Sequence, residues 1–145
     1  MDAAKIMHRT VPVIGPETSL QAAAQVLRES GAPMLVVMEG ERLVGGLYAR
    51  DLGVEACARG LDPTRTPVRE TMRGRVPMCG PADAPEDALE RLREAGVDAL
   101  AVVDDSGRVI GMLTLLSLLS VLVFAAAGEP GPELEHARRV RGEPT

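Results

Sequence analysis

The stretch MHRTVPVIGP at residues 7–16 recurs 65 residues further on as MRGRVPMCGP at residues 72–81. The two stretches share Met, Val, Pro, Gly and Pro at the same places, and the likeness extends through the segments that follow. After a one-residue insertion at Gly107 the spacing becomes 66. Two similar copies in one short chain usually pack against each other about a pseudo-twofold axis. The sequence therefore predicts two related clefts in which a ligand could lie.

The composition predicts one domain, or two small and closely packed ones, with an aliphatic core. Of the 145 residues, 46% are hydrophobic, but only one Phe, one Tyr and no Trp are present. The formal net charge of −5 disfavours contact with nucleic-acid phosphates or anionic lipid, and the shortage of aromatic rings disfavours stacking on single-stranded nucleic acid. Nucleic acid is therefore not among the expected partners.

Each copy predicts the element order β-α-β-β-α. Apolar runs predict the strands, and polar turns and Gly-Pro pairs separate them. In the first copy the strands are expected at 11–14, 34–38 and 43–47, and the second helix at 49–59. In the second copy the corresponding segments are 76–79, 100–103, 109–113 and 115–127. Such a unit has a three-stranded sheet with an open apolar face, so we expect the two copies to pack sheet to sheet.

The first helix of each copy carries predicted signals at both ends. A capping box, in which a side-chain acceptor precedes Gln or Glu by three residues, is expected at Thr18 with Gln21 and at Asp83 with Glu86. Gly31 and Gly96 stand where a left-handed residue would end each helix. The predicted boundaries are 1–59 for the first copy, 60–67 for a linker, 68–127 for the second copy and 128–145 for a polar, flexible tail.

Cys57 and Cys79 lack the spacing of zinc ligands, so no metal site is expected, and Cys79 is predicted to be a small buried hydrophobic residue. The N-terminus shows no apolar signal segment, so a reducing, cytoplasmic location is expected. The uncharged stretch Val109–Gly128 is long enough to span a bilayer, which keeps a membrane helix open as an alternative. Its first residues match the strand at 43–47, which favours a strand followed by a helix.

The tandem arrangement resembles the pair of cystathionine-β-synthase (CBS) domains known as a Bateman module. The resemblance rests on the opening Met followed by Val-Pro, on the buried strand with its preceding turn at 31–37 and 96–103, and on the segment after each hairpin. In the family that segment reads Gly, two apolar residues, Thr or Ser, two variable residues and Asp. Here it reads GGLYARD at 45–51 and GMLTLLS at 111–117.

The resemblance implies an α+β fold of two CBS repeats packed about a pseudo-twofold axis. It also implies regulatory binding of an adenosine-containing ligand: AMP, ADP or ATP, and in some members S-adenosylmethionine or a dinucleotide such as NAD. The Asp would accept hydrogen bonds from the ribose hydroxyls, and the Thr or Ser hydroxyl would contact phosphate. Each cleft would join this segment of one copy to the first strand and the pre-strand turn of the other. No cofactor beyond that ligand is required.

Two candidate clefts follow from the resemblance. The first holds Asp51, Arg50 and Tyr48, with Pro77, Val97 and Asp98 opposite and Arg73 and Arg75 as phosphate partners. The second holds Thr114 and Ser117, with Pro12, Ala32 and Pro33 opposite and His8, Arg9 and Thr10 near its mouth. Neither signature is whole, because Tyr48 replaces the hydroxyl residue of the first copy and Ser117 replaces the Asp of the second.

Several of these residues also have a purely structural interpretation. Asp51 could be a carboxylate that favours the dipole at a helix N-terminus, and Thr114 is expected to be the N-cap of the last helix. His8 is expected to be a surface or packed histidine. Tyr48 either fills the cleft or supplies the missing hydroxyl, and Asp98 would repel a phosphate if it faced Asp51.

The sequence favours a stand-alone regulatory module over an enzyme, since no nucleophile stands beside a base and no metal-ligand cluster is visible. The alternative is a ligand-free dimerisation or protein-interaction module whose nucleotide clefts are degraded. A homodimer through the terminal helices is expected, because the last helix carries more apolar residues than one small domain needs: Leu115, Leu116, Leu119, Leu122 and Val123. The sequence does not identify a regulated partner protein.

Overall fold

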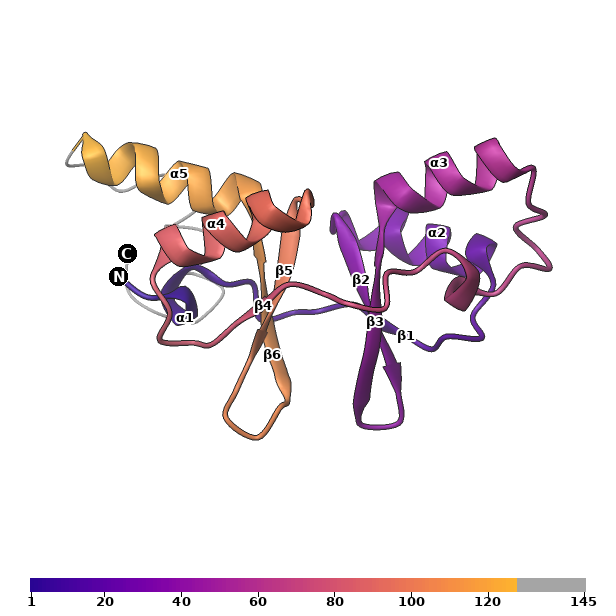
Figure 1. Ribbon diagram of the computed structural model, residues 1–145, viewed down its shortest axis with the longest axis horizontal. Helices are drawn as coiled ribbons and strands as arrows, with labels where there is room; N and C mark the ends of the chain where they lie inside the picture. The colour runs from indigo at the N-terminus through magenta and orange to yellow at the C-terminus, as the bar shows by residue number, and fades with distance from the viewer. Residues whose placement is uncertain (128–145) are drawn as a thin grey trace. The chain divides into compact units, whose positions relative to one another are not determined.

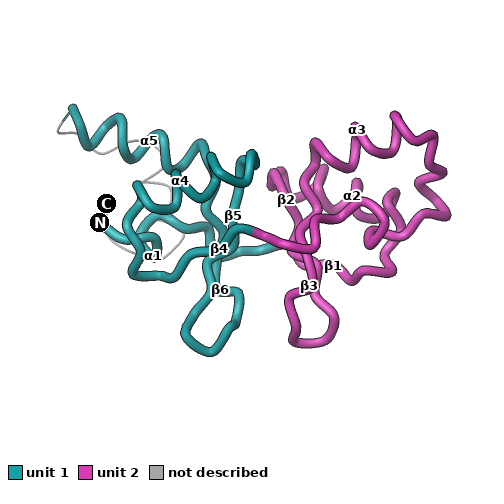
Figure 2. The backbone as a smooth tube through the Cα atoms, in the orientation of Figure 1, with its two compact units in different colours: residues 1–11, 77–145 teal, residues 12–76 magenta. Residues whose placement is uncertain are grey.

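The computed structural model describes residues 1–127 and divides into two compact units. The copy-one unit is formed by Pro12–Val76, and the copy-two unit contains, among the described residues, Met1–Val11 and residues 77–127 (Figure 2). The opening segment of each sequence copy therefore belongs to the unit built on the other copy. The tail predicted at 128–145 lies outside the described residues.

The copy-one unit is a three-stranded sheet with helices on one face (Figure 1). Strand β1 (Val13–Ile14) pairs in parallel with β2 (Met34–Glu39), which pairs antiparallel with β3 (Arg42–Tyr48). The helices are α2 (Leu20–Ser30), α3 (Ala49–Arg59) and the short 3-10 helix η1 (Val68–Glu70). Buried residues of α2 and η1 pack with alternate residues of the strands: Leu20, Ala23, Leu27 and Val68 with Ile14, Leu35, Val37 and Leu47.

The copy-two unit repeats this topology. Strand β4 (Met78–Cys79) pairs in parallel with β5 (Ala99–Val103), which pairs antiparallel with β6 (Val109–Thr114). The helices are α1 (Ala3–Ile6), α4 (Pro85–Ala95) and α5 (Leu115–Ala126). The core joins all three helices to the sheet: Ala3, Ile6, Ala88, Leu92, Leu118 and Val121 with Cys79, Leu100, Val102 and Leu113.

The predicted α+β fold with two β-α-β-β-α repeats is confirmed, and α1 and η1 are short additions to it. Helix α3 has the predicted bounds, and the stretch around Gly111 is extended, as a strand of the repeat requires. Gly31 and Gly96 end α2 and α4 with φ angles of 67° and 66°, the left-handed conformation that glycine adopts without strain.

Both predicted capping boxes are wrong. The N-cap of α2 is Ser19, one residue after Thr18, and its hydroxyl accepts a hydrogen bond from the backbone N–H of Ala22 at 3.1 Å. In the second copy α4 begins at Pro85, so Asp83 lies too early to cap it. Its carboxylate instead accepts from the Gly80 N–H at 2.8 Å and from Arg91 at 2.9 Å, which closes the turn after β4.

Two glycines in the β-strands let the opening segments lie close to β3 and β6. Arg73 and Gly46 exchange two backbone hydrogen bonds of 2.9 Å in the copy-one unit, and His8 and Met112 exchange bonds of 2.8 and 2.9 Å in the copy-two unit. A Cβ atom on Gly45 would stand 2.5 Å from the Arg73 carbonyl oxygen, and one on Gly111 would stand 2.5 Å from the Met7 sulfur. This close approach brings residues 73 and 8 beside the starts of α3 and α5.

Cys79 is buried as predicted, and burial raises the pKa of its thiol to about 11. The apolar run from Val109 is divided between β6 and α5, which confirms the favoured strand-then-helix interpretation. Within residues 1–127, no helix combines the length and the apolar character that a bilayer crossing needs.

Candidate functional site

The junction between β3 and α3 positions three of the predicted ligand-binding residues. Strand β3 ends at Tyr48, which is the N-cap residue of α3, so Arg50 and Asp51 fall in the first helical turn. A carboxylate in this turn interacts favourably with the positive end of the helix dipole. Tyr48 is buried, Arg50 is exposed and Asp51 is partly exposed.

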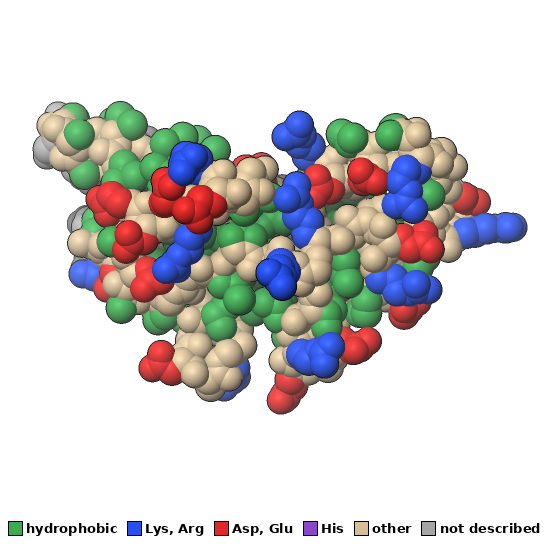
Figure 3. All heavy atoms as spheres, in the orientation of Figure 1, with side chains coloured by type: hydrophobic (Ala, Val, Ile, Leu, Met, Phe, Trp, Pro, Cys, Tyr) green, Lys and Arg blue, Asp and Glu red, His purple; other side chains and the backbone are tan. Residues whose placement is uncertain are grey.

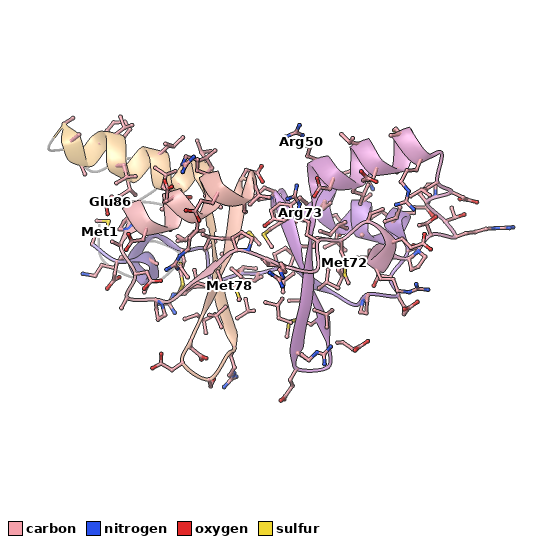
Figure 4. All side chains as sticks on the ribbon, viewed as in Figure 1. Met1, Arg50, Met72, Arg73, Met78 and Glu86 are labelled. Carbon is pink, nitrogen blue, oxygen red and sulfur yellow. The ribbon has the colours of Figure 1, made fainter. Side chains whose placement is uncertain are left out.

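Asp51 is held by Arg73, which the strand pairing with Gly46 places beside it. The Arg73 Nε donates to Oδ2 of Asp51 at 2.6 Å, and Nη2 donates to Oδ1 at 3.3 Å. The guanidinium carbon also lies 5.4 Å from the centre of the Tyr48 ring, within cation–π range. The hydrogen bond to Asp51 raises the pKa of Arg73 above its usual value. We call Tyr48, Asp51 and Arg73 the Asp51 cluster; Figure 4 labels Arg73 and the neighbouring Arg50.

The copy-two unit has a different set of residues at the matching positions. Thr114, Ser117 and His8 correspond to Tyr48, Asp51 and Arg73 in the sequence repeat. The Thr114 hydroxyl accepts from the Ser117 N–H at 3.1 Å, which confirms Thr114 as the N-cap of α5, and it donates to the Ser117 hydroxyl at 2.9 Å.

The Ser117 hydroxyl is also hydrogen-bonded to His8 Nε2 at 3.0 Å, and Ser117 is only 2% exposed. We call these three residues the Ser117 cluster. His8 is thus a packed histidine, one of the roles expected for it. Ser117 is buried and is hydrogen-bonded to both Thr114 and His8, so this position offers no partly exposed carboxylate comparable to Asp51.

The turn that precedes the central strand lies next to the last helix within each unit. The Pro33 carbonyl accepts from the N–H of Ala49 at 3.0 Å, and the Asp98 carbonyl accepts from Leu115 at 2.8 Å. Pro12 and Pro77 anchor the central strands in the same way, through carbonyl bonds of 3.1 Å to Val36 and Ala101. Ala32 and Pro33 thus share a unit with Asp51, whereas Val97 and Asp98 share one with Thr114.

Each predicted cleft therefore draws on both units. Asp51, Arg50 and Tyr48 belong to the copy-one unit, and the wall expected opposite them belongs to the copy-two unit: Pro77, Val97 and Asp98. The reverse holds for Thr114 and Ser117 and for their expected wall of Pro12, Ala32 and Pro33. That these groups face each other remains a prediction. Arg75, Arg9 and Thr10 are exposed.

The direct contact between Arg73 and Asp51 was not predicted, because 22 residues separate them and the sequence assigned Arg73 to phosphate. One sequence signal could have indicated the contact: the two positions differ together between the copies. The first copy has Asp51, and the residue that contacts it is Arg73; at the matching positions the chain has Ser117 and His8. Among residues 1–127, no group of three or more His, Cys, Asp or Glu side chains could hold a metal ion.

Comparison with solved structures shows the same fold in other proteins. A conserved CBS-domain protein of unknown function from Thermoplasma acidophilum is 28% identical and has a TM-score of 0.79, with 96% of this chain and 76% of that chain covered. The CBS domain pair of protein MJ0100, in complex with 5′-methylthioadenosine and S-adenosyl-L-methionine, is 20% identical with a TM-score of 0.75, covering 88% and 98%. The cytosolic domain of the Mg²⁺ channel MgtE in complex with ATP is 25% identical with a TM-score of 0.66, covering 80% and 46%.

The sequence comparisons agree with the structural ones. The chain spans between 16% and 63% of the length of the first curated relatives that it matches, at 25–35% identity. The CBS-domain family model matches it twice, at residues 3–52 and 68–124, which are the two copies seen in the repeat. The chain therefore belongs to the CBS-domain family and carries the domain as a tandem pair.

Proposed function

We propose that this chain is a regulatory module that binds an adenosine-containing ligand through Asp51. The observation that carries the proposal is the position of this carboxylate in the first turn of α3, with its side chain 23% exposed. It stands at the place where the CBS motif has the ribose-binding Asp, and a carboxylate can accept hydrogen bonds from both hydroxyls of a ribose. The matching position in the second copy is a buried serine.

The ligands of two structural relatives support the choice of ligand class. The MJ0100 domain pair was solved with 5′-methylthioadenosine and S-adenosyl-L-methionine, and the MgtE domain was solved with ATP. Adenine with its ribose ring is the part that these three molecules share, while their 5′ groups differ in size and charge. The proposal for this chain is therefore adenosine recognition, with AMP, ADP, ATP and S-adenosylmethionine as the compounds to test.

The surroundings of Asp51 suit a ligand that carries negative charge. Arg50 follows Tyr48 in the first turn, and Arg73 and Arg75 lie on the opening segment that pairs with β3. Guanidinium groups bind phosphates through paired, charge-assisted hydrogen bonds. Pro77, Val97 and Asp98 are proposed to complete the site from the copy-two unit. There the negative charge of Asp98 would repel a phosphate.

The proposal assigns binding and signalling to the chain, and no catalysis. A ligand acts on such a module by having different affinities for two of its conformations. Another protein would respond to that change of conformation. The two free cysteines, Cys57 and Cys79, are compatible with a location in the reducing cytoplasm. No cofactor beyond the nucleotide is proposed.

Isothermal titration calorimetry with AMP, ADP, ATP and S-adenosylmethionine tests the proposal. We expect binding of at least one of them, with a loss of about tenfold or more in affinity on Asp51→Ala, because a charge-assisted hydrogen bond is lost. Asp83→Ala is the matched control, since Asp83 also pairs with an arginine, at 2.9 Å, but lies in the turn after β4. An absence of heat with every compound at millimolar concentration would contradict the proposal.

A second role, association through α5, is favoured by one surface. Leu116, Leu119 and Val123 are 66%, 42% and 62% exposed, and Figure 3 shows hydrophobic side chains gathered along this helix. Leu115 was expected on the same surface but packs against the core, and Leu122 is partly buried. We propose a homodimer through this face, because neighbouring exposed apolar side chains on one helix often mark a protein–protein interface. Light scattering of the unmodified chain and of Leu119→Glu tests it: a monomer in both samples excludes the dimer.

A further inference from the structure

The Asp51 carboxylate that the proposed function assigns to ribose is already occupied in the structure. Both of its oxygens accept hydrogen bonds from Arg73, at 2.6 and 3.3 Å. A guanidinium that bridges both oxygens uses the outward edge of the carboxylate, which is the edge that two neighbouring ribose hydroxyls would need. Arg73 and a ribose therefore compete for Asp51.

The backbone of Arg73 is held in place, so opening the ion pair requires its side chain to move. Its backbone is held by the two hydrogen bonds of 2.9 Å to Gly46, and a substituent on Gly45 would collide with its carbonyl oxygen. The side chain itself is 40% exposed, so water or a ligand group can reach the guanidinium when the ion pair opens. A ligand can therefore open the pair without disturbing the strand pairing that places residue 73.

The cost of opening the pair depends on the charge of the ligand. A neutral nucleoside would take Asp51 and leave the guanidinium without its counter-charge, in a region that already carries the exposed Arg50 and Arg75. A nucleotide would take Asp51 with its ribose and offer its phosphate to the displaced guanidinium, which forms strong forked bonds with phosphate oxygens.

We propose that Arg73 is a specificity latch: it blocks the ribose acceptor until a ligand supplies an anionic group to replace Asp51 as its partner. The inference rests on the proposed function and goes beyond it, because it selects adenosine nucleotides over uncharged adenosine compounds. In the second copy this device is absent, since His8 takes the matching place and binds a buried serine.

Calorimetry of AMP and adenosine against the full chain and its Arg73→Gln variant tests the latch. In the unmodified chain AMP is expected to bind about tenfold or more tighter than adenosine, because of charge-assisted bonds to the displaced guanidinium. In Arg73→Gln the adenosine affinity rises and the AMP affinity falls, which brings the two to within about threefold. Adenosine that binds only to the variant would support the latch equally.

Arg69→Gln is the matched control, because Arg69 pairs with Glu17 at 2.8 Å in the same unit and should leave both affinities unchanged. Arg73→Lys, which keeps the charge, is the second variant and should keep the preference for AMP. If AMP weakens in Arg73→Gln while adenosine stays unchanged, the latch is excluded and the proposed function stands. If neither compound binds to the unmodified chain or to any variant, the latch is excluded, and the titrations with ADP, ATP and S-adenosylmethionine decide whether the proposed function fails with it.

Discussion

Tyr48, Asp51 and Arg73 in the copy-one unit occupy the same places as Thr114, Ser117 and His8 in the copy-two unit, and the two clusters differ in chemistry. The Asp51 cluster is an ion pair against an aromatic ring, with its charged groups 23% and 40% exposed. The Ser117 cluster joins two hydroxyls and an imidazole through hydrogen bonds of 2.9 and 3.0 Å, with Ser117 buried.

The backbone around the two clusters is nearly the same in both units. Each opening segment pairs with the last strand through two backbone hydrogen bonds, and each last helix follows that strand directly. The difference lies in the two side chains that meet at this place: Asp51 and Arg73 in the copy-one unit, Ser117 and His8 in the copy-two unit. Both members of the pair differ between the units. The CBS repeat therefore fixes where a polar contact forms, while the residues at its two ends decide whether that contact is a partly exposed ion pair or a set of hydrogen bonds to a buried serine.

The largest effect is expected from a variant that disrupts the backbone pairing between an opening segment and the last strand of its unit. Gly45→Ala places a methyl group 2.5 Å from the Arg73 carbonyl oxygen, a backbone atom that cannot give way, so we expect a loss of about 1–3 kcal/mol in the free energy of unfolding. Gly111→Ala meets the flexible end of Met7 first and should cost less. Urea denaturation of both variants measures the difference. Gly53→Ala, in α3 with open space around it, is the control and should raise stability by up to about 1 kcal/mol.

A smaller effect is expected from salt, which should weaken the Asp51 cluster and leave the Ser117 cluster nearly unchanged. A double-mutant cycle with Asp51→Asn and Arg73→Gln, measured by the free energy of unfolding, is expected to give a coupling energy of about 0.5–1 kcal/mol at low ionic strength. This coupling energy should shrink as sodium chloride is added. The cycle with Ser117→Ala and His8→Ala, measured at pH 8, is expected to give about 0.5–1.5 kcal/mol with little response to salt. Equal salt dependence in the two cycles would mean that the clusters do not differ in charge as described.

The smallest effect is expected on stability at acid pH. It arises from a difference between the turns that precede α2 and α4. The Gly80 N–H and the Arg91 guanidinium lower the pKa of Asp83, whereas the matching residue of the first copy is Thr18, which does not titrate. A carboxyl whose pKa is lowered by folding stabilises the protein above its unfolded pKa, and this contribution is lost as the pH falls through the folded value. Thermal unfolding at pH 7 and pH 3 should therefore show a smaller pH dependence in Asp83→Asn. An unchanged pH dependence would contradict the assignment.

Most of the fold was accessible to sequence reasoning because the repeat supplied each signal twice. Strand runs, Gly-Pro turns and the glycines after α2 and α4 act locally, and the corresponding elements appeared at or near their predicted bounds. The helix caps failed because the competition there is finer. Thr18 and Ser19 are neighbouring candidates for the N-cap, and Ser19, of the residue type preferred there, takes the position. The Asp83 carboxylate accepts from the Gly80 N–H instead of capping α4.

The sequence predicted the residues of the candidate site that lie at helix starts, but not the partners that contact them. The motif placed Tyr48, Asp51, Thr114 and Ser117 at helix starts, since those positions depend on the local order of strand and helix. Their partners Arg73 and His8 come from the opening segment of the other copy, 22 and 109 residues away, and no local pattern reports such a contact.

The exchange of opening segments between the copies has a consequence for any shorter form of this protein. In their own sheets β3 and β6 are edge strands, and residues 73 and 8 are what pair with their outer sides. A fragment cut between the repeats would expose such an edge, which is a template for unwanted association. One repeat alone would have to pair this edge with its own opening segment or with that of a second molecule, and the second route would give an intertwined dimer.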